Sequence, residues 1–175
     1  SDGVEYAINS RAVDNATNLE ISISTVTFTY DITLPTSTII TPSPNASPPT
    51  LYEQAPVVSG TAGDTSPGQL SKVKISLQHD PALTGHYWRP GVGWVGGQYW
   101  IDATGTGNWS WGSSGVTWKN PGVEELYLIE VRAVDKAENY QSPVSTSAFR
   151  FRAPLPQTAI SKPVEGKYYN IDGLP

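Results

Sequence analysis

The chain contains the same segment twice. Residues 6–18 read Tyr-Ala-Ile-Asn-Ser-Arg-Ala-Val-Asp-Asn-Ala-Thr-Asn, and residues 127–139 read Tyr-Leu-Ile-Glu-Val-Arg-Ala-Val-Asp-Lys-Ala-Glu-Asn. The offset is 127 − 6 = 121, and it persists further along the chain, because Phe28 recurs as Phe149. A fixed period of this length indicates tandem duplication of a folded unit.

This period sets the expected domain organisation. We expect one complete unit at 31–152, preceded at 1–30 by the C-terminal strands of another repeat and followed at 153–175 by the N-terminal strand or strands of a third. Neither flanking fragment contains enough apolar sequence to bury a core alone. The sequence therefore predicts a segment of a longer array.

Composition removes several classes of protein. The chain has no Cys, which excludes a disulfide scaffold and a Cys-based metal site. Its net charge of −5 argues against nucleic acid as a partner. No apolar run approaches the ~20 residues of a membrane helix, so we expect no membrane insertion in this segment.

Apolar residues alternate with polar ones instead of following a helical period. Val73, Ile75 and Leu77 fall on one face of a strand, and Tyr127 and Ile129 do the same. Turn-forming Gly, Pro and Asn residues separate the apolar segments. The expected strands of the complete unit are 37–41, 56–62, 71–78, 86–90, 97–103, 107–111, 126–134 and 144–151, with a short one at 50–53.

Short strands without a helical pattern favour an all-β, antiparallel two-sheet sandwich. Trp109 and Trp111 lie two residues apart, hence on one strand face, and are expected to supply core.

Several segments, taken in order, resemble a known family. They are Val58-Ser-Gly-Thr-Ala-Gly-Asp64, Asn108-Trp-Ser-Trp111 and the run from Arg132 to Asn139, followed by Leu155-Pro156. This order is similar to that of the tandem bacterial immunoglobulin-like domains of large surface and adhesion proteins. The resemblance implies an immunoglobulin-like sandwich in a repeat array. It also implies an extracellular or cell-surface location.

The repeated Asp-x-Ala-x-Asn turn has two interpretations. The structural one is that Asp135 and Asn139 bond to backbone amides and fix the hairpin between the last two strands. The alternative is implied by the resemblance, because some relatives bind calcium at their joints through such Asp residues. On that view Asp14 and Asp31 would act together at the first joint. At the second joint Asp135 would meet Arg152, which occupies the position of Asp31 and cannot bind a cation.

A Trp-rich stretch at 86–111 is the other candidate for chemistry. Trp88, Trp94 and Trp100 could stack on sugar rings, which would make the stretch a glycan-binding module. They could equally pack on their own sheet, because aromatic cross-strand pairs stabilise sheets directly. Contact with another subunit is a third interpretation.

We find no catalytic or cofactor-binding arrangement in the sequence and expect no enzyme. The first functional hypothesis is a structural segment of a long extracellular filament, stalk or adhesin, whose partners are the neighbouring repeats. The alternatives are the glycan-binding module, contact with other subunits of a surface assembly, and an accessory segment of a larger secreted enzyme.

The linkers between units contain proline, which fixes φ and extends the chain. The first linker contains Pro35, and the second contains Pro154 and Pro156. We predict that neither joint is a free hinge, that the second is at least as stiff as the first, and that calcium does not affect the second.

Overall fold

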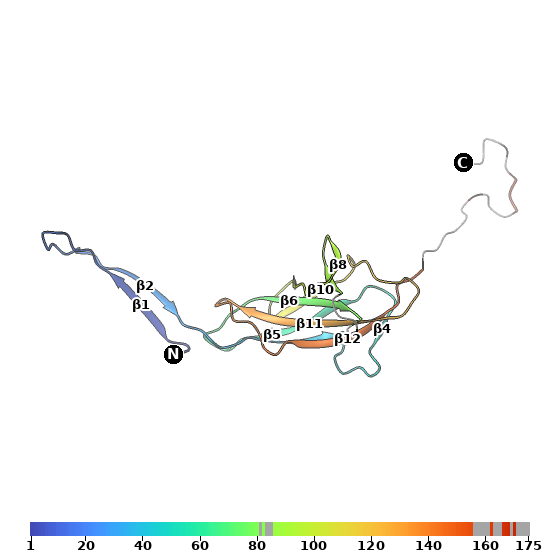
Figure 1. Cartoon of the computed structure of the whole chain (residues 1–175), viewed down its shortest axis with the longest axis horizontal. Coiled ribbons are helices and arrows are strands. Elements are labelled where there is room, and N and C mark those ends of the chain that lie inside the picture. Colours follow the sequence, from blue (N-terminus) through green and yellow to red (C-terminus); the bar gives the residue numbers. More distant parts are fainter. Residues whose placement is uncertain (81, 83–85, 156–161, 163–165, 169, 171–175) are drawn as a thin grey trace.

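The computed structural model describes residues 1–80, 82, 86–155, 162, 166–168 and 170 (Figure 1). Over these residues the chain is all-β and contains no helix. The strands are β1 (Glu5–Ser10), β2 (Ser24–Thr29), β3 (Thr36–Thr41), β4 (Leu51–Tyr52), β5 (Val57–Gly63), β6 (Leu70–His79), β7 (Tyr87–Arg89), β8 (Gly93–Val95), β9 (Ile101–Asp102), β10 (Asn108–Gly112), β11 (Glu125–Asp135) and β12 (Ser145–Phe151). None of the described residues forms a helix long and apolar enough to cross a membrane.

Strands β3 to β12 form two sheets. The smaller sheet has the order β10-β5-β3, and the larger has the order β4-β12-β11-β6-β7-β8, with β9 also paired to β6. All pairings are antiparallel except that of β4 with β12. This arrangement confirms the predicted antiparallel all-β fold and is that of a β-sandwich.

One apolar core lies between the two sheets. The alternating residues of β11 and β12 point into it, so Tyr127, Ile129 and Phe149 are fully buried. The smaller sheet contributes Ile39, Val58 and Trp109 to the same cluster. Trp111 packs against the cluster while only partly buried. The expectation that Trp109 and Trp111 supply core is therefore confirmed.

One predicted strand is largely wrong. The segment 97–103 is extended as a strand only at β9, and residues 98–100 pair with no strand. Two side chains of this segment instead contact β11. Gln98 donates a 2.5 Å hydrogen bond to Glu130, and the Arg132 guanidinium lies 4.0 Å from the centroid of the Trp100 ring.

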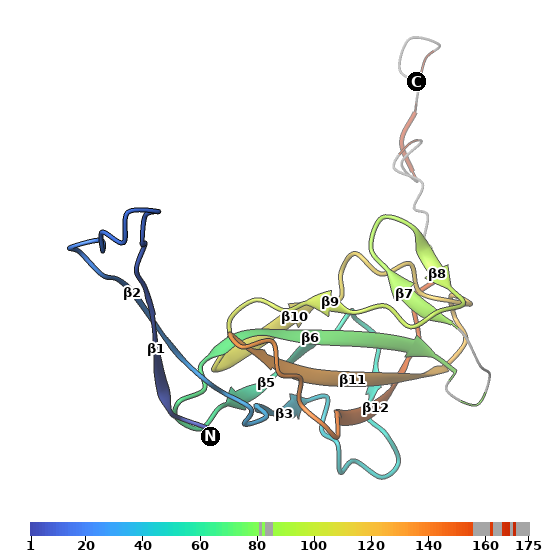
Figure 2. The same cartoon turned by 60° about the vertical axis from the view of Figure 1, so that its left-hand side comes forward.

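Strands β1 and β2 form a separate two-stranded hairpin that projects from one end of the sandwich (Figures 1 and 2). Its pairing reproduces that of β11 and β12 at the same offset. Tyr6 lies opposite Phe28 just as Tyr127 lies opposite Phe149. The first pair of rings stacks with centroids 5.4 Å apart at 19°, and the second with centroids 5.5 Å apart at 21°.

The two hairpins differ in burial. Tyr6 is 39% exposed and Phe28 is 46% exposed, whereas Tyr127 and Phe149 are both 0% exposed. The two hairpins therefore have the same strand pairing, but the apolar face is buried in β11–β12 and exposed to solvent in β1–β2. The strand or strands predicted within 153–175 fall mostly on residues outside the described part of the chain. Residues 153–155, which the structure describes, pair with no strand.

Candidate metal centre at the first joint

The turn between β11 and β12 is built on one aspartate. Asp135 accepts hydrogen bonds from the Asn139 backbone amide and from the Asn139 side-chain amide, both at 2.8 Å. This confirms the structural role predicted for the pair. Asp14 and Asn18 make the same two bonds at the tip of the first hairpin, at 2.9 and 2.8 Å.

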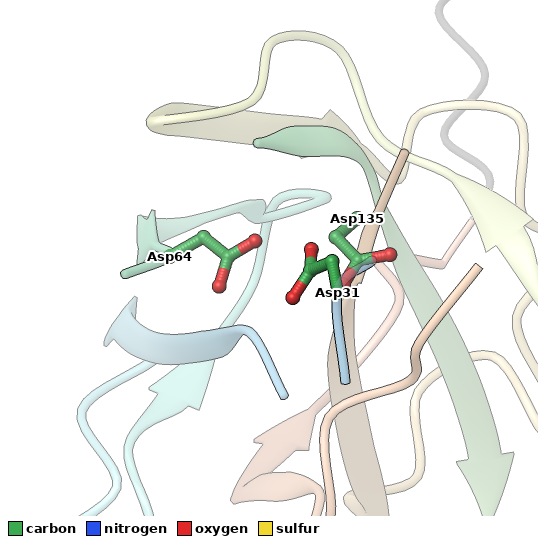
Figure 3. A group of neighbouring side chains, drawn as sticks. All are labelled: Asp31, Asp64 and Asp135. Carbon is green, nitrogen blue, oxygen red and sulfur yellow. The ribbon is translucent and has the colours of Figure 1, made fainter. Parts of the chain in front are cut away.

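Three carboxylates meet beside this turn. Asp31, Asp64 and Asp135 each place an oxygen within 4.8 Å of the others (Figure 3). Asp31 follows β2, Asp64 follows β5 and Asp135 ends β11. Antiparallel pairing brings these positions to one end of the sandwich, because Thr36 is paired with Gly63 and Asp135 with Leu70.

The carboxylate of Asp64 lies in an environment that disfavours its charged form. Burial raises the pKa of its carboxyl, and the negative charges of Asp135, Asp31 and Asp2 raise this pKa further. One of its oxygens, Oδ2, is buried and has no hydrogen-bond partner, while Oδ1 accepts from the Thr65 amide at 2.9 Å.

Gly68 makes room for this carboxylate. A Cβ at Gly68 would lie 2.3 Å from the unpartnered Oδ2 of Asp64. The backbone therefore packs directly on the acidic cluster, and any side chain at this position would displace Asp64.

The linker beside the cluster is bonded from both sides. From the first hairpin, Asp2 accepts from the Ile32 amide at 2.9 Å and from the Thr33 hydroxyl at 2.6 Å. From the sandwich, the Asn139 side chain donates to the Asp31 carbonyl at 3.1 Å. These bonds restrict the dihedrals of the first linker beyond the restriction that Pro35 imposes.

The expected grouping of calcium ligands was wrong. Asp14 lies at the tip of the first hairpin, beyond the end of β1, whereas Asp31 lies at its base, and the six-residue strands between them alone span about 20 Å. Asp135 belongs to the first joint with Asp31, not to the second joint. The reason is geometric, because the turn of a hairpin and the end of its last strand lie at opposite ends.

The second joint is built differently. Arg152 leaves β12 at the other end of the sandwich, where it forms an ion pair with Glu53. The Gly122 amide donates to the Ala153 carbonyl at 2.8 Å, and the Leu155 side chain packs against Gly122. This joint brings a cationic side chain where the first joint has a carboxylate.

The Trp residues proposed for glycan binding do not share one surface. Trp88 belongs to the core and is 5% exposed. Trp94 packs against that core and donates its indole N–H to the Thr117 carbonyl at 2.7 Å. Trp100 stacks on Arg132 on the outer side of the larger sheet. Glycan binding by these residues stays a prediction, and Trp94 and Trp100 are partly exposed whereas Trp88 is buried.

The cluster fits the cation that the family resemblance implies. Calcium takes six to eight oxygen ligands, with carboxylates prominent among them. Asp31, Asp64 and Asp135 would hold such an ion, and Oδ2 of Asp64 is buried there without a hydrogen-bond partner. A bound cation would neutralise the repulsion within the cluster and tie the linker to two loops of the sandwich.

Sequence reasoning missed Asp64 as a member of this site. It read Gly63 and Asp64 as part of a turn, whereas Gly63 is the last residue of β5 and Asp64 follows it, before the turn at Ser66 and Pro67. The usable signal was positional, because an Asp directly after a strand that ends beside Asp135 must lie near it.

Comparison with protein-family models gave no match to this chain, and comparison with curated proteins gave no significant similarity. The repeat, the joints and the cluster are therefore the features of this chain that bear on its function.

We expect Asp64→Asn to stabilise the sandwich at neutral pH without divalent cations. Removing one of three clustered charges should raise the free energy of unfolding by on the order of 1 kcal/mol. Because the pKa of Asp64 is raised on folding, the wild-type protein becomes more stable as pH falls through that pKa. The gain from the substitution should therefore shrink in acid.

Urea unfolding at several pH values measures this effect. Calcium should raise the unfolding temperature of the wild-type chain, and Asp64→Asn should remove most of that rise. Asp102→Asn serves as the control, because Asp102 pairs with Lys74 at 2.7 Å outside the cluster and should not gain stability. A less stable Asp64→Asn protein at neutral pH would contradict this electrostatic account.

Proposed function

We propose that this chain is a structural segment of a long extracellular filament, stalk or adhesin in which immunoglobulin-like sandwich units follow one another. The observation that supports it most is the repetition of the β11–β12 hairpin by β1–β2. Register, ring stacking and turn bonding agree at positions 121 residues apart (127 − 6 = 121). A unit of this kind contacts mainly its neighbours along the chain.

The function of such a segment is to set distance and direction. The sandwich provides a rigid body, and its short linkers decide how freely the next body turns. The first linker is held by Asp2 and Asn139, and the second is anchored by Arg152 and Leu155. Both features favour a stiff spacer, which holds a terminal domain at a fixed distance, and disfavour a flexible tether.

The two joints would respond differently to calcium. The first gathers three carboxylates, Asp31, Asp64 and Asp135, beside the linker. The second brings Arg152 to the position of Asp31. A cation would therefore stiffen the first joint and leave the second unchanged.

Small-angle scattering on two longer chains tests this proposal. One chain joins 31–152 to a complete unit upstream, and the other joins it to a complete unit downstream. We expect both chains to be extended. We expect a chelator to widen the range of angles between the two units in the first chain only. Compact or freely jointed profiles for both chains would contradict the spacer function, and a chelator effect at the Arg152 joint would contradict the assignment of the cation site.

A further inference from the structure

The open face of the β1–β2 hairpin is an apolar surface that the described residues leave uncovered. Tyr6, Ile8, Val26 and Phe28 are between 39% and 63% exposed on it. A two-stranded hairpin alone is at best marginally stable in water. Contiguous exposed apolar side chains of this kind mark an interaction surface.

The equivalent hairpin shows what covers such a face. The second edge of β11 carries β6, which pairs with it antiparallel and places Leu77 opposite Ile129. The smaller sheet packs on the same face through Ile39, Val58 and Trp109. In the first hairpin, the described residues provide β1 with no partner besides β2.

We infer that an upstream β-strand of the same polypeptide pairs antiparallel with the free edge of β1, with an apolar residue opposite Ile8 as Leu77 lies opposite Ile129. This inference rests on the proposed function and specifies the partner segment. The strand would take the place that Val73–Leu77 takes beside β11, and a second sheet would cover Phe28 as the smaller sheet covers Phe149.

Two positions argue against a second copy of this chain as the occupant. Val26 stands where the complete unit has Ser147, whose hydroxyl donates to the Pro42 carbonyl at 2.9 Å. Ser10 stands where the complete unit has Val131, which is 0% exposed. If the sandwich of another copy covered this hairpin, its Pro42 carbonyl would lose the hydroxyl donor that Ser147 provides. The Ser10 hydroxyl would also be buried at a position that Val131 fills in the complete unit. Both changes are unfavourable. The hairpin therefore fits the core of an upstream unit whose sequence differs from that of 31–152.

Amide hydrogen exchange, measured on two chains, tests the inference. The first is the 175-residue chain. The second is the same chain extended at its N-terminus by about 91 encoded residues, which would complete one period of 121 (121 − 30 = 91). In the first chain, β1 amides should exchange far faster than those of β11. In the extended chain, exchange across β1 should slow by about 100-fold or more. Strong protection of β1 without the extension, or no added protection with it, would overturn the inference.

Two further measurements separate the occupants. Sedimentation of the 175-residue chain should show a monomer, and a dimer whose formation protects β1 would identify a second copy instead. In the extended chain, Ile8→Lys should lower the unfolding temperature of the upstream unit, whereas Ala7→Lys on the opposite face of β1 should change it little. Equal effects of the two substitutions would contradict the proposed packing. Joint stiffness in scattering does not depend on this outcome, so the two proposals can fail separately.

Discussion

Replacing Phe149 with alanine should lower the free energy of unfolding of the sandwich by about 3–5 kcal/mol, whereas Phe28→Ala should change it by less than about 0.5 kcal/mol. Both side chains stack on a tyrosine directly across a hairpin. Phe149 is 0% exposed and contributes to the core, and Phe28 is 46% exposed outside it. The loss at Phe149 combines lost burial with the cavity that remains.

Denaturant unfolding of the two variants, followed by tryptophan fluorescence, measures the difference. All six Trp lie in 88–118, so this signal reports on the sandwich and not on the first hairpin. Similar losses for both variants would show that the first hairpin stabilises this sandwich, and the division into separate units would then be wrong.

Gly60→Ala should destabilise the sandwich by about 3 kcal/mol or more, and it could prevent folding. Gly60 lies on the central strand of the smaller sheet, between Ile39 and Trp109. A Cβ there would lie 1.9 Å from the Thr38 carbonyl oxygen and 2.4 Å from Cζ2 of Trp109. The backbone oxygen cannot move without breaking the sheet, so the cost is large.

Gly63→Ala is the matched control on the same strand. A Cβ at Gly63 would meet nothing within 4 Å, so we expect a change within about 0.5 kcal/mol. Thermal unfolding of the two variants side by side checks the prediction. A Gly60→Ala protein as stable as Gly63→Ala would mean that β3, β5 and β10 do not approach one another as closely as the structure shows.

The strands of the complete unit were largely predictable because their signal is local. Val73, Ile75 and Leu77 alternate in the sequence and are all 0% exposed in the structure. Strand β8 was missed, and 97–103 is a strand only at β9: Gln98 donates a hydrogen bond to Glu130, and the Trp100 ring stacks on Arg132, both on a strand distant in sequence. No periodicity within the segment itself could reveal that contact.

The acidic cluster was only partly predictable for a related reason. The repeat directed attention to Asp14 and Asp135 by their motif and to Asp31 by its place in the linker, but neither signal says which end of the sandwich each residue reaches. Once Thr36 is known to pair with Gly63, Asp64 must lie beside them. Site membership depended on strand pairing, which a single sequence does not specify.

Unfolding of residues 31–152 alone tests the central claim most directly, namely that the sandwich is one autonomous unit and the first hairpin belongs to another. We predict a cooperative all-β transition with a midpoint within a few degrees of that of the 175-residue chain, since ~1 kcal/mol shifts the midpoint of a domain of this size by about 4 °C. If the isolated unit fails to fold, or melts well below the longer chain, the hairpin is part of the sandwich and the account is wrong.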